Sequence, residues 1–513
     1  MMAARDTRSE TGPMLGDLLQ GVDLRPEDAR IPVTDLVQDS RRAGPGAVFV
    51  ALAGTHGHGL EHAADAAAQG ASAILWDEGE PSETRLDVPL IHVPGLRERL
   101  PEMARALFGA WPEAAPLVAV TGTDGKTSVT HLIALALEAL GRSTGLIGTL
   151  GFGRPGQLVD TGHTTPGVLD LHRQLAALAG AGCDAVALEA SSHGLAQGRL
   201  AGAPIGVAVL TRLSSDHLDF HGSQEAYAAA KARLFAWPGL QTAVLNVDDA
   251  FGRQLAGALA PGVQALTYSA AGAPADLSAR DVEATPEGLR FTLVADGRTY
   301  PVCSALFGLF QVGNLLATLA TLQALGVERE AAITALKELP GVPGRMERFP
   351  LPNGVLAVVD YAHTAEALEA ALCALRPHTA GRLSVVFGCG GDRDRGKRPA
   401  MGQVACRQAD VVFVTDDNPR GEDPAAIRAE VLAGCANAVE CHEIGDRATA
   451  IASALAEAAA GDVVLVAGKG HETTQEIRGQ RYPFSDREQV QAQAGRHLQD
   501  ARGDDRAHRE EGQ

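Results

Sequence analysis

Residues 121–128 read TGTDGKTS, and they lie between an apolar run at 116–121 and a helix-like stretch at 126–140. The two glycines let the backbone turn tightly and point its amide groups at an anion, and the dipole of the following helix also favours negative charge. Lys126 would reach the β- and γ-phosphates of a nucleotide, and the Thr127 hydroxyl would bind Mg²⁺. The stretch therefore predicts a phosphate-binding loop. The alternative, an ordinary strand-to-helix turn that carries a lysine, fits this context less well.

Strand-like apolar runs alternate with helix-like stretches after this loop, which is typical of parallel sheets flanked by helices. The runs lie at residues 184–189, 205–211, 242–246, 355–361, 383–387, 411–415 and 463–467. Between the third and fourth run, LPGVPGR (residues 339–345) holds two prolines and two glycines, which indicates a linker between domains. A second doubly wound sheet is therefore expected after the linker.

We predict an α/β protein of three domains with a short segment at each end. The charged last residues contain few aliphatic side chains, so a disordered tail is expected there. The predicted parts are an N-terminal extension or domain start at 1–30, an N-terminal α/β substrate domain at 31–113, a central P-loop ATPase-like domain with a parallel sheet at 114–341, a C-terminal Rossmann-like domain at 342–495 and the tail at 496–513.

The composition excludes several classes of protein. With 45% hydrophobic and 21% charged residues the chain is typical of globular proteins, and a net charge of −19 argues against nucleic-acid binding through a general basic field. The most apolar long stretch, 301–327, is interrupted by polar residues, and the first fourteen residues lack the apolar core of a secretory signal. We expect a cytoplasmic protein without a membrane partner, whose seven cysteines are reduced because they form no C-x-x-C pair.

The loop resembles that of the Mur ligase family, ATP-dependent amide-forming enzymes of peptidoglycan synthesis. An Asn commonly stands in this family where the chain has Asp124, and an acid beside bound phosphate has to turn to solvent or to a metal. The folate-polyglutamate synthetases share this kind of loop, so the loop alone identifies a superfamily. The resemblance implies that ATP is bound by Gly122, Thr123, Asp124, Gly125, Lys126, Thr127 and Ser128.

Three residues downstream are candidates for metal binding and catalysis. Glu189 closes the apolar run DAVALEA, at the strand end where ligands gather in open α/β sheets. His217 and Lys231 each have an ordinary alternative, a loop histidine and a lysine that reaches the surface. However, DHLDFHG followed by YAAAKARLF resembles the family segment with a metal-binding histidine and a lysine that CO₂ carbamylates. The resemblance implies that Lys231, as N6-carboxylysine, binds Mg²⁺ with Thr127, Glu189 and His217. It also implies that the catalytic residues are Lys126, Lys231, His217 and Glu189.

Two later motifs resemble the family's linker and the first strand of its last domain. They are PGRMERF (343–349) and VVDYAHT (358–364), and they imply that Arg345 meets a phosphate and that Asp360 holds the ribose or a metal-bound water. The ordinary alternatives are a hinge arginine and a helix N-cap. Asn314, in FQVGNLLA, resembles a position near the adenine, although an Asn within a helix can also bind a neighbouring backbone group.

Three polar segments of the last domain each follow a strand-like run, so they are expected to form one pocket. Arg393 and Arg420 fit carboxylates bidentately and Glu472 fits an ammonium, a set that suits an amino acid with extra ionised groups. The DNPR motif resembles that of the diaminopimelate-adding branch of the family, whose lysine-adding members lack the arginine. The resemblance implies that meso-diaminopimelate is bound by Arg393, Asp417, Asn418, Pro419, Arg420, Gly468 and Glu472.

The other substrate is implied by scattered polar residues earlier in the chain. Each of them alone is an ordinary loop residue, but their order matches the family positions that contact a UDP-muramoyl-dipeptide, with the UDP on the N-terminal domain. These residues are Ser40, Thr164, Thr165, Ser191, Gln197 and Arg199.

The resemblance covers roughly residues 39–488 and implies a ligase that adds meso-diaminopimelate to UDP-MurNAc-L-Ala-D-Glu through an acyl phosphate, with ATP and Mg²⁺. An L-lysine-adding ligase and a folate-polyglutamate synthetase are alternatives within the class. Arg420 opposes the first, and the N-terminal domain and DNPR oppose the second. A P-loop switch without ligase activity is the alternative from another class, and it leaves Lys231 and the DNPR pocket without a purpose.

Overall fold

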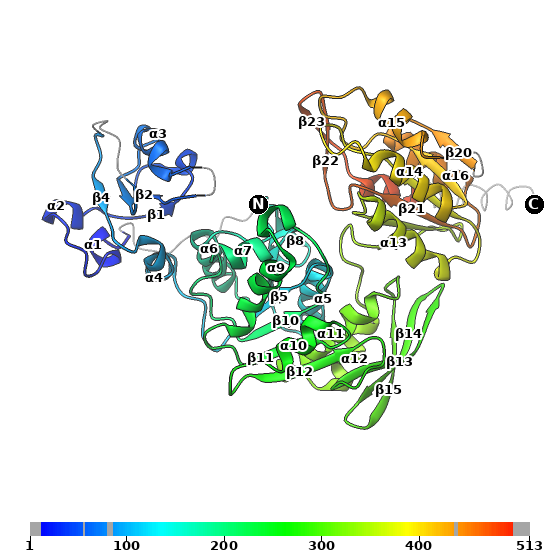
Figure 1. Ribbon diagram of the computed structural model, residues 1–513, viewed down its shortest axis with the longest axis horizontal. Helices are drawn as coiled ribbons and strands as arrows, with labels where there is room; N and C mark the ends of the chain where they lie inside the picture. The colour runs from blue at the N-terminus through cyan, green and yellow to red at the C-terminus, as the bar shows by residue number, and fades with distance from the viewer. Residues whose placement is uncertain (1–11, 55–56, 80–85, 436–439, 496–513) are drawn as a thin grey trace, which may run out of the picture. The chain divides into compact units, whose positions relative to one another are not determined.

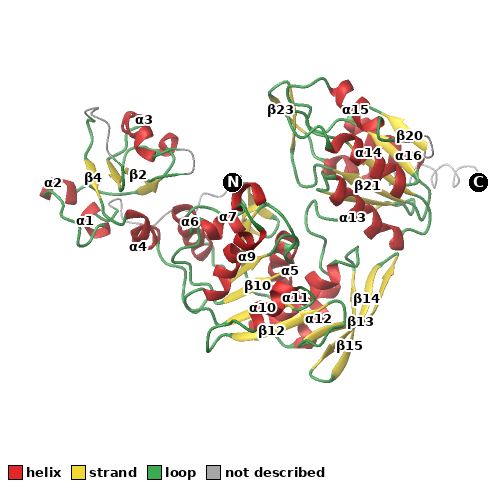
Figure 2. Ribbon diagram, in the orientation of Figure 1, coloured by secondary structure: helices red, strands yellow, loops and turns green. Residues whose placement is uncertain are grey.

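The computed structural model describes residues 12–54, 57–79, 86–435 and 440–495. Within them the chain forms two compact units, one made of Met1–Lys126, Gly141–Ala243 and Gly257–Ala265 and the other of Thr127–Leu140, Val244–Ala256 and Leu266–Gln513. Figures 1 and 2 draw their helices and strands. The predicted tail lies outside the described residues, as do the first eleven residues of the predicted N-terminal extension.

The first unit begins with a parallel four-stranded sheet in the order β1-β2-β3-β4. Every position of β2 is buried, because helices and loops cover both faces of a parallel sheet. Leu15 and Leu19 belong to the apolar cluster on one of these faces. The elements are α1 (Leu15–Leu18), α2 (Pro26–Ala29), β1 (Asp35–Val37), η1 (Ser40–Arg42), β2 (Ala47–Ala51), η2 (Gly59–His62), α3 (Ala63–Ala68), β3 (Ala73–Trp76), β4 (Leu90–His92) and α4 (Leu96–Phe108).

A sheet of eleven strands follows, in the order β15-β14-β13-β12-β11-β10-β5-β9-β6-β7-β8. Its central strands β10, β5, β9 and β6 are parallel, and Val120 of β5 pairs with Glu189 of β9. This register brings Glu189 beside the start of the phosphate-binding loop. In chain order, the elements from β5 to β12 are β5 (Leu117–Thr121), α5 (Lys126–Ala139), β6 (Thr144–Gly148), β7 (Gly151–Arg154), β8 (Gln157–Val159), α6 (Val168–Gly180), β9 (Ala185–Glu189), α7 (Ser192–Ala196), β10 (Val207–Leu210), α8 (Leu218–His221), α9 (Gln224–Ala232), η3 (Arg233–Ala236), β11 (Thr242–Asn246), α10 (Ala250–Ala256) and β12 (Gln264–Ser269).

The second unit includes three long strands that pair antiparallel in sequence order and are drawn as long yellow arrows in Figure 2. Two helices follow them. These elements are β13 (Leu277–Thr285), β14 (Gly288–Ala295), β15 (Arg298–Ser304), α11 (Gln311–Ala324) and α12 (Arg329–Lys337).

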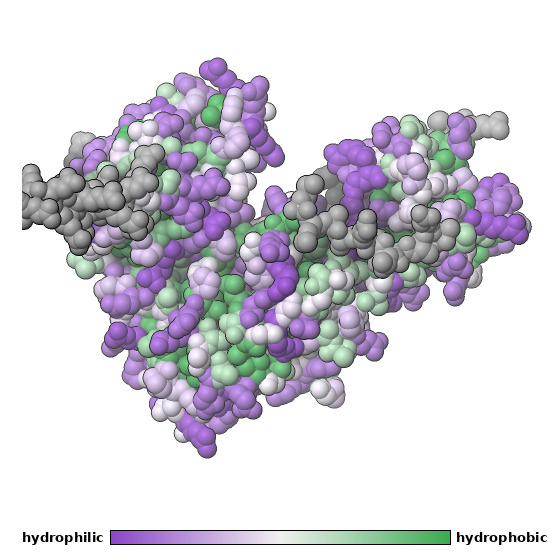
Figure 3. Space-filling view, turned by 180° about the vertical axis from the view of Figure 1, so that it is seen from behind, coloured by the Kyte–Doolittle hydropathy of each residue, from purple (hydrophilic) through white to green (hydrophobic). Residues whose placement is uncertain are grey.

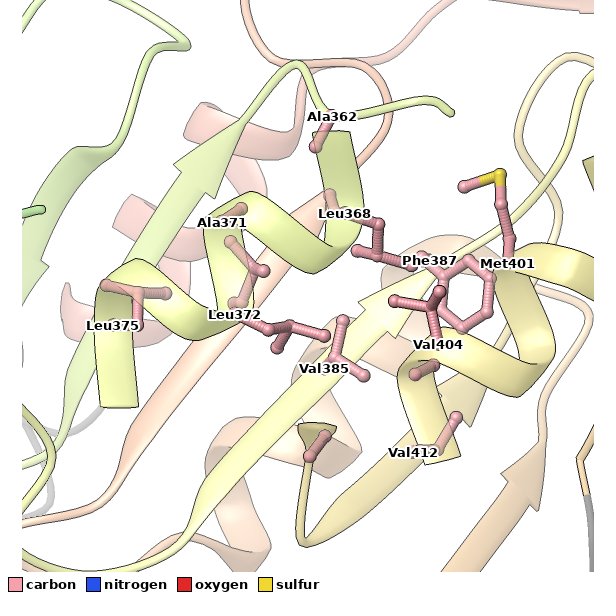
Figure 4. Close-up of a cluster of buried hydrophobic side chains, with 14 of the residues drawn as sticks. Ala362, Leu368, Ala371, Leu372, Leu375, Val385, Phe387, Met401, Val404 and Val412 are labelled. Atoms are coloured by element: carbon pink, nitrogen blue, oxygen red, sulfur yellow. The ribbon is translucent and has the colours of Figure 1, made fainter. Parts of the chain in front are cut away.

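The C-terminal part of this unit is a six-stranded sheet in the order β16-β17-β21-β18-β19-β20, in which only β16 is antiparallel to its neighbour. In Figure 4, Leu368 and Leu372 of α13 lie toward Val385 of β18, near Phe387 and Met401. The elements are β16 (Glu347–Pro350), β17 (Leu356–Asp360), α13 (Ala365–Leu375), η4 (Arg376–His378), β18 (Leu383–Phe387), α14 (Lys397–Gln408), β19 (Val411–Val414), α15 (Pro424–Leu432), β20 (Glu440–Glu443), α16 (Arg447–Glu457), β21 (Val463–Ala467), β22 (Thr474–Ile477) and β23 (Gln480–Pro483).

The expected α/β class is confirmed, since parallel strands and helices alternate through most of the described chain. No helix in these residues combines the length and apolar character of a bilayer span. The face of the molecule in Figure 3 mixes hydrophilic and hydrophobic residues. All seven cysteines are free thiols.

Candidate active site

The loop between β5 and α5 is held by the end of β10. Gly122 has a φ of 150°, and a Cβ atom there would lie 1.9 Å from Thr211 Oγ1, so the position requires glycine. Thr211 Oγ1 donates a hydrogen bond to Asp124 O at 2.5 Å, and Thr123 N donates to Arg212 O at 2.6 Å. One side of the loop is therefore held by hydrogen bonds that its own backbone makes with Thr211 and Arg212.

The ammonium of Lys126 lies over this loop, where Nζ donates to Gly122 O at 3.0 Å and to Thr123 O at 2.8 Å. The neighbouring Asp124 does not contact the loop in this way. Asp124 is exposed, and its carboxylate lies 3.5 Å from Ser214 Oγ. Because this carboxylate faces solvent, the acid is compatible with an anion at the loop.

Lys231 is a buried amine beside the same loop. It lies in α9 with 1% of its surface exposed, and Nζ donates to Gly122 O at 2.7 Å. The Tyr227 ring packs 4.5 Å from Nζ, and the Tyr227 hydroxyl lies 3.0 Å from Thr123 Oγ1. Burial, and then the positive charge of Lys126, lower the pKa of Lys231 to about 6. The side chain is thus a largely neutral amine at pH 7.

The two other predicted metal ligands have different surroundings. Glu189 is fully buried and accepts from Thr149 N at 2.8 Å and Thr149 Oγ1 at 3.1 Å. A Cβ atom at Gly148 would lie 2.3 Å from Glu189 Oε1, so the glycine leaves room for this carboxylate. His217 has a φ of 52° and a half-exposed ring whose Nε2 lies 3.4 Å from Asp216 Oδ2.

The predicted dipeptide-binding residues join Glu189 in one network. Thr164 Oγ1 lies 3.0 Å from Thr149 Oγ1, which itself donates to the Glu189 carboxylate. Thr165 Oγ1 donates to Glu189 O at 2.7 Å and accepts from Ser191 N at 3.0 Å. The structure therefore brings these predicted residues together with the end of β9.

Arg199 extends this network. Nη1 donates to Thr165 O at 2.9 Å, and Nε donates to Gln197 Oε1 at 2.8 Å. Ser40 begins η1, and Arg42 at the end of η1 donates to an aspartate in the first turn of α6 at 2.9 Å. The predicted UDP-binding segment thus contacts the helix that follows Thr165.

The remaining predicted nucleotide contacts from the central part of the chain are buried. Thr127 and Ser128 stand in the first turn of α5. Asn314 lies in α11, where Nδ2 donates to Gln311 Oε1 at 2.7 Å. This last contact agrees with the ordinary alternative for Asn314, an amide that binds a neighbour within its own helix.

Asp360 at the end of β17 forms a hydrogen bond with the residue that follows the linker at 339–345. Oδ2 accepts from Met346 N at 2.8 Å and Oδ1 accepts from Ala362 N at 2.9 Å, while burial raises the pKa of the carboxyl group. Thr364, and not Asp360, caps α13, so the N-cap alternative is excluded. The Arg345 guanidinium lies 4.7 Å from the centre of the ring of the tyrosine that follows Asp360.

The loops after β18, β19 and β21 converge, as the sequence predicts. Asn418 Nδ2 donates to Glu472 Oε2 at 3.0 Å. Lys469 Nζ donates to Asn418 Oδ1 at 2.9 Å, to Glu472 Oε2 at 3.2 Å and to Asp417 Oδ1 at 3.4 Å. A buried ammonium thus joins two of the three loops.

Arg420 joins the third loop to these two. Nη1 donates to Gly391 O at 2.8 Å, and Nε lies 3.6 Å from Glu476 Oε2. A Cβ atom at Gly390 would lie 2.8 Å from Arg420 Nη1 and 3.8 Å from Arg393 Cγ, so both guanidinium side chains flank this glycine. These contacts bring together three segments that are far apart in the sequence, and the residues predicted to bind an ionised amino acid all belong to them: Arg393, Asp417, Asn418, Pro419, Arg420, Gly468 and Glu472.

Known protein families and curated relatives match most of the chain. Family models match residues 33–107 (Mur ligase family, catalytic domain), 120–322 (Mur ligase middle domain) and 344–470 (Mur ligase, glutamate ligase domain). A curated relative from Xanthomonas campestris pv. campestris is 49% identical over 458 residues, which cover 89% of this chain and 92% of the relative. The chain belongs to the Mur ligase family.

The relatives of this Mur ligase carry a common name. The Xanthomonas protein and a relative from Pseudomonas aeruginosa, 48% identical over 90% of this chain and 94% of its own, are both UDP-N-acetylmuramoyl-L-alanyl-D-glutamate–2,6-diaminopimelate ligases. A solved structure with the same name is 38% identical, with a TM-score of 0.70 over 95% of this chain and 99% of its own. MurF ligase from Thermotoga maritima in complex with ADP is 21% identical with a TM-score of 0.59 over 91% and 99% of the two chains, which shows the shared fold.

Three residues of this Mur ligase lie among the predicted site residues although the sequence patterns did not single them out. Tyr227 lies one helical turn before Lys231, which is a spacing that places both on one face of α9. Lys469 lies within the motif AGKGHETTQ, between two glycines. Arg447 binds the Asp486 carboxylate through Nε and Nη2, both at 2.7 Å, and no local pattern indicates this contact.

Proposed function

We propose that this Mur ligase joins 2,6-diaminopimelate to the D-glutamyl carboxylate of UDP-N-acetylmuramoyl-L-alanyl-D-glutamate, with cleavage of ATP to ADP and phosphate. The observation that carries the proposal is the DNPR loop, whose Arg420 stands with Asn418 and Glu472 in one charged pocket. Relatives 47–49% identical over about nine-tenths of the chain are named for this reaction. The cytoplasm is the expected location.

The residues around the phosphate-binding loop fit a magnesium ion. Mg²⁺ prefers oxygen ligands, and Glu189 offers a carboxylate while Thr127 offers a hydroxyl at the start of α5. His217 and a carbamylated Lys231 would complete the set of ligands. When bound, the ion would offset negative charge on the transferring phosphoryl group.

Carbamylation of Lys231 is supported by its state in the structure. An amine whose pKa is about 6 is mostly neutral at pH 7, and only the neutral amine has the electron pair that attacks CO₂. The new N–C bond forms as one proton leaves the nitrogen. The product carries a negative charge and two acceptor oxygens in place of a neutral amine, which suits a site beside the ammonium of Lys126.

The reaction proceeds in two displacements. An oxygen of the D-glutamyl carboxylate attacks the γ-phosphorus, the bond to the β-phosphate oxygen breaks, and ADP leaves. The amine of diaminopimelate then attacks the carbonyl carbon of the acyl phosphate, phosphate leaves with the electron pair of the broken C–O bond, and the amine loses a proton. Lys126 stabilises the charge on the phosphoryl group during the first displacement.

The C-terminal pocket selects the amino acid. Arg420 matches the distal carboxylate of diaminopimelate, and Glu472 matches an ammonium group. L-Lysine has the same distal ammonium but a hydrogen in place of that carboxylate, so the arginine would face a cation with no anion beside it and would repel it. A folate-polyglutamate synthetase and a switch without product would both leave this pocket unexplained.

The first experiment measures phosphate release from ATP and Mg²⁺ with the UDP-muramoyl-dipeptide, and compares meso-diaminopimelate with L-lysine, with mass spectrometry of the product. Turnover with diaminopimelate alone is expected. A preference for L-lysine would refute the selectivity while the ligase class stands. The variant Lys126→Ala should lose about a hundred- to a thousandfold in kcat, with Lys337→Ala, on the exposed end of α12, as the matched control.

A further inference from the structure

Lys469 lies at the centre of the C-terminal pocket, and the mechanism above gives it no role. It is the second residue after β21, stands between two glycines of positive φ, and its side chain is completely buried. Its ammonium donates to Asn418 Oδ1, Glu472 Oε2 and Asp417 Oδ1, at 2.9 to 3.4 Å. These three acceptors match the three donors of an ammonium, so its hydrogen-bonding capacity is satisfied by the protein.

Asn418 transmits this arrangement to Glu472. Its Oδ1 accepts from Lys469 Nζ and from Glu476 N at 3.0 Å, so the amide nitrogen faces Glu472 and donates to Oε2 at 3.0 Å. Oε2 of Glu472 therefore has two donors, whereas Oε1 has no hydrogen-bond partner within the described residues. The carboxylate is oriented with one oxygen available to a ligand.

The charges of the cluster leave room for one more cation. Two carboxylates, Asp417 and Glu472, share the single ammonium of Lys469, which leaves one net negative charge when all three are ionised. Arg447 does not change this sum, because its guanidinium is paired bidentately with Asp486. One ammonium group of a ligand would balance the cluster.

The choice of lysine at this position is itself informative. The chain has only five lysines among its 44 basic residues. Arg398 and Arg447, which are equally buried, are arginines bound to carboxylates. An ammonium directs three donors from one atom to three acceptors, which the planar fork of a guanidinium does not reproduce.

We propose that Lys469 is a positioning residue for the amino-acid substrate. It fixes Glu472 so that Oε1 accepts an ammonium group of diaminopimelate. Its positive charge also keeps the net charge of the cluster at −1, which one ammonium group of this substrate balances. The inference rests on the proposed function, and it assigns the ammonium-binding end of the pocket to a unit of three residues, Lys469, Asn418 and Glu472.

The test is a set of steady-state measurements on the full-length enzyme with Lys469→Met. The KM for diaminopimelate should rise about ten- to a hundredfold, the range that a lost hydrogen bond to a charged group gives, while the KM values for ATP and the UDP-muramoyl-dipeptide stay within about twofold. Lys337→Met, on the exposed end of α12, is the matched control and should equal the wild type. An unchanged KM for diaminopimelate, or an equal loss for all three substrates, would overturn the proposal.

A second variant separates charge from packing. Lys469→Met combined with Asp417→Asn restores the net charge of the cluster, so it should bind diaminopimelate at least about threefold better than Lys469→Met alone. A purely structural role predicts that the second change adds to the damage. If Lys469→Met does not fold, Lys469→Arg keeps the charge, and it should raise the KM for diaminopimelate alone. Wild-type enzyme without turnover of diaminopimelate would refute the proposed function instead.

Discussion

Lys231 and Lys469 are both buried, yet their surroundings differ in kind. Lys231 reaches one carbonyl oxygen among the described residues and faces the positive charge of Lys126, and its pKa falls to about 6. Lys469 reaches two carboxylates and an amide oxygen. Burial and the charge of Lys126 make Lys231 a reactive amine, whereas Lys469 is fixed by three hydrogen-bond acceptors. In our proposals, Lys231 therefore has a chemical role, whereas Lys469 positions other residues.

Replacement of each lysine by arginine gives the largest contrast. Lys231→Arg should lower kcat about a hundredfold or more, because a guanidinium forms no carbamate and carries a positive charge beside the phosphate-binding loop. Lys469→Arg should keep kcat near the wild-type value at saturating diaminopimelate and raise its KM about tenfold. Phosphate-release kinetics measure both. Equal effects on kcat would break the comparison.

Labelled carbon dioxide distinguishes the two amines directly. In ¹³CO₂-equilibrated buffer we expect one carbamate signal in the carbon NMR spectrum, which is absent in Lys231→Met and retained in Lys469→Met. Because the pKa of Lys231 is lowered to about 6, the neutral amine increases as the pH rises through 6, and the signal should grow between pH 5 and 7. A signal that is lost only in Lys469→Met would reverse the assignment.

The buried amine also makes stability depend on pH. The pKa of Lys231 in the folded protein, about 6, lies below its ordinary value of 10.5, so the unfolded chain binds more protons between these two pH values. In CO₂-free buffer, the melting temperature of the wild type relative to Lys231→Met should therefore rise with pH from about 6 toward 10.5 and stay level below 6. A difference that is constant over this window would mean that the amine is charged in the fold.

The smallest effect is expected at Asp124. Its carboxylate is exposed, so Asp124→Asn should change kcat/KM for ATP by less than about threefold. Its negative charge raises the pKa of Lys231, so the amide should shift the onset of the carbamate signal to slightly lower pH. A large loss of activity would mean that the carboxylate turns toward the nucleotide.

The fold was predictable where local patterns were strong. The helix at 126–139 and the strands at 242–246 and 383–387 match the expected runs, because continuous apolar stretches are typical of buried parallel strands. The antiparallel strands β13–β15 were not expected. Charged side chains such as Arg280 and Arg290 interrupt their apolar residues, and the second half of β14 alternates between buried and partly exposed positions, so these strands form no continuous apolar run.

The residues of the candidate site also fall into two groups, those that local sequence patterns predict and those that they do not. The phosphate-binding loop is contiguous, so its residues could be predicted from spacing, and the DNPR pocket followed from three segments at strand ends. The burial of Lys231 and the role of Lys469 could not be predicted, because both depend on partners far along the chain, such as Gly122 and Asn418. A lysine in a helix usually reaches solvent, and only the packed structure shows that Lys231 does not.

The burial pattern of the five lysines makes chemical footprinting unusually simple. Among them only Lys337 is exposed, Lys126 and Lys397 are partly covered, and Lys231 and Lys469 are buried. An amine-directed acylating reagent should therefore mark Lys337 first in the native protein. Lys231, as the buried amine with the lowered pKa, would become the reporter of local opening, and its protection by dissolved CO₂ could be read peptide by peptide after digestion.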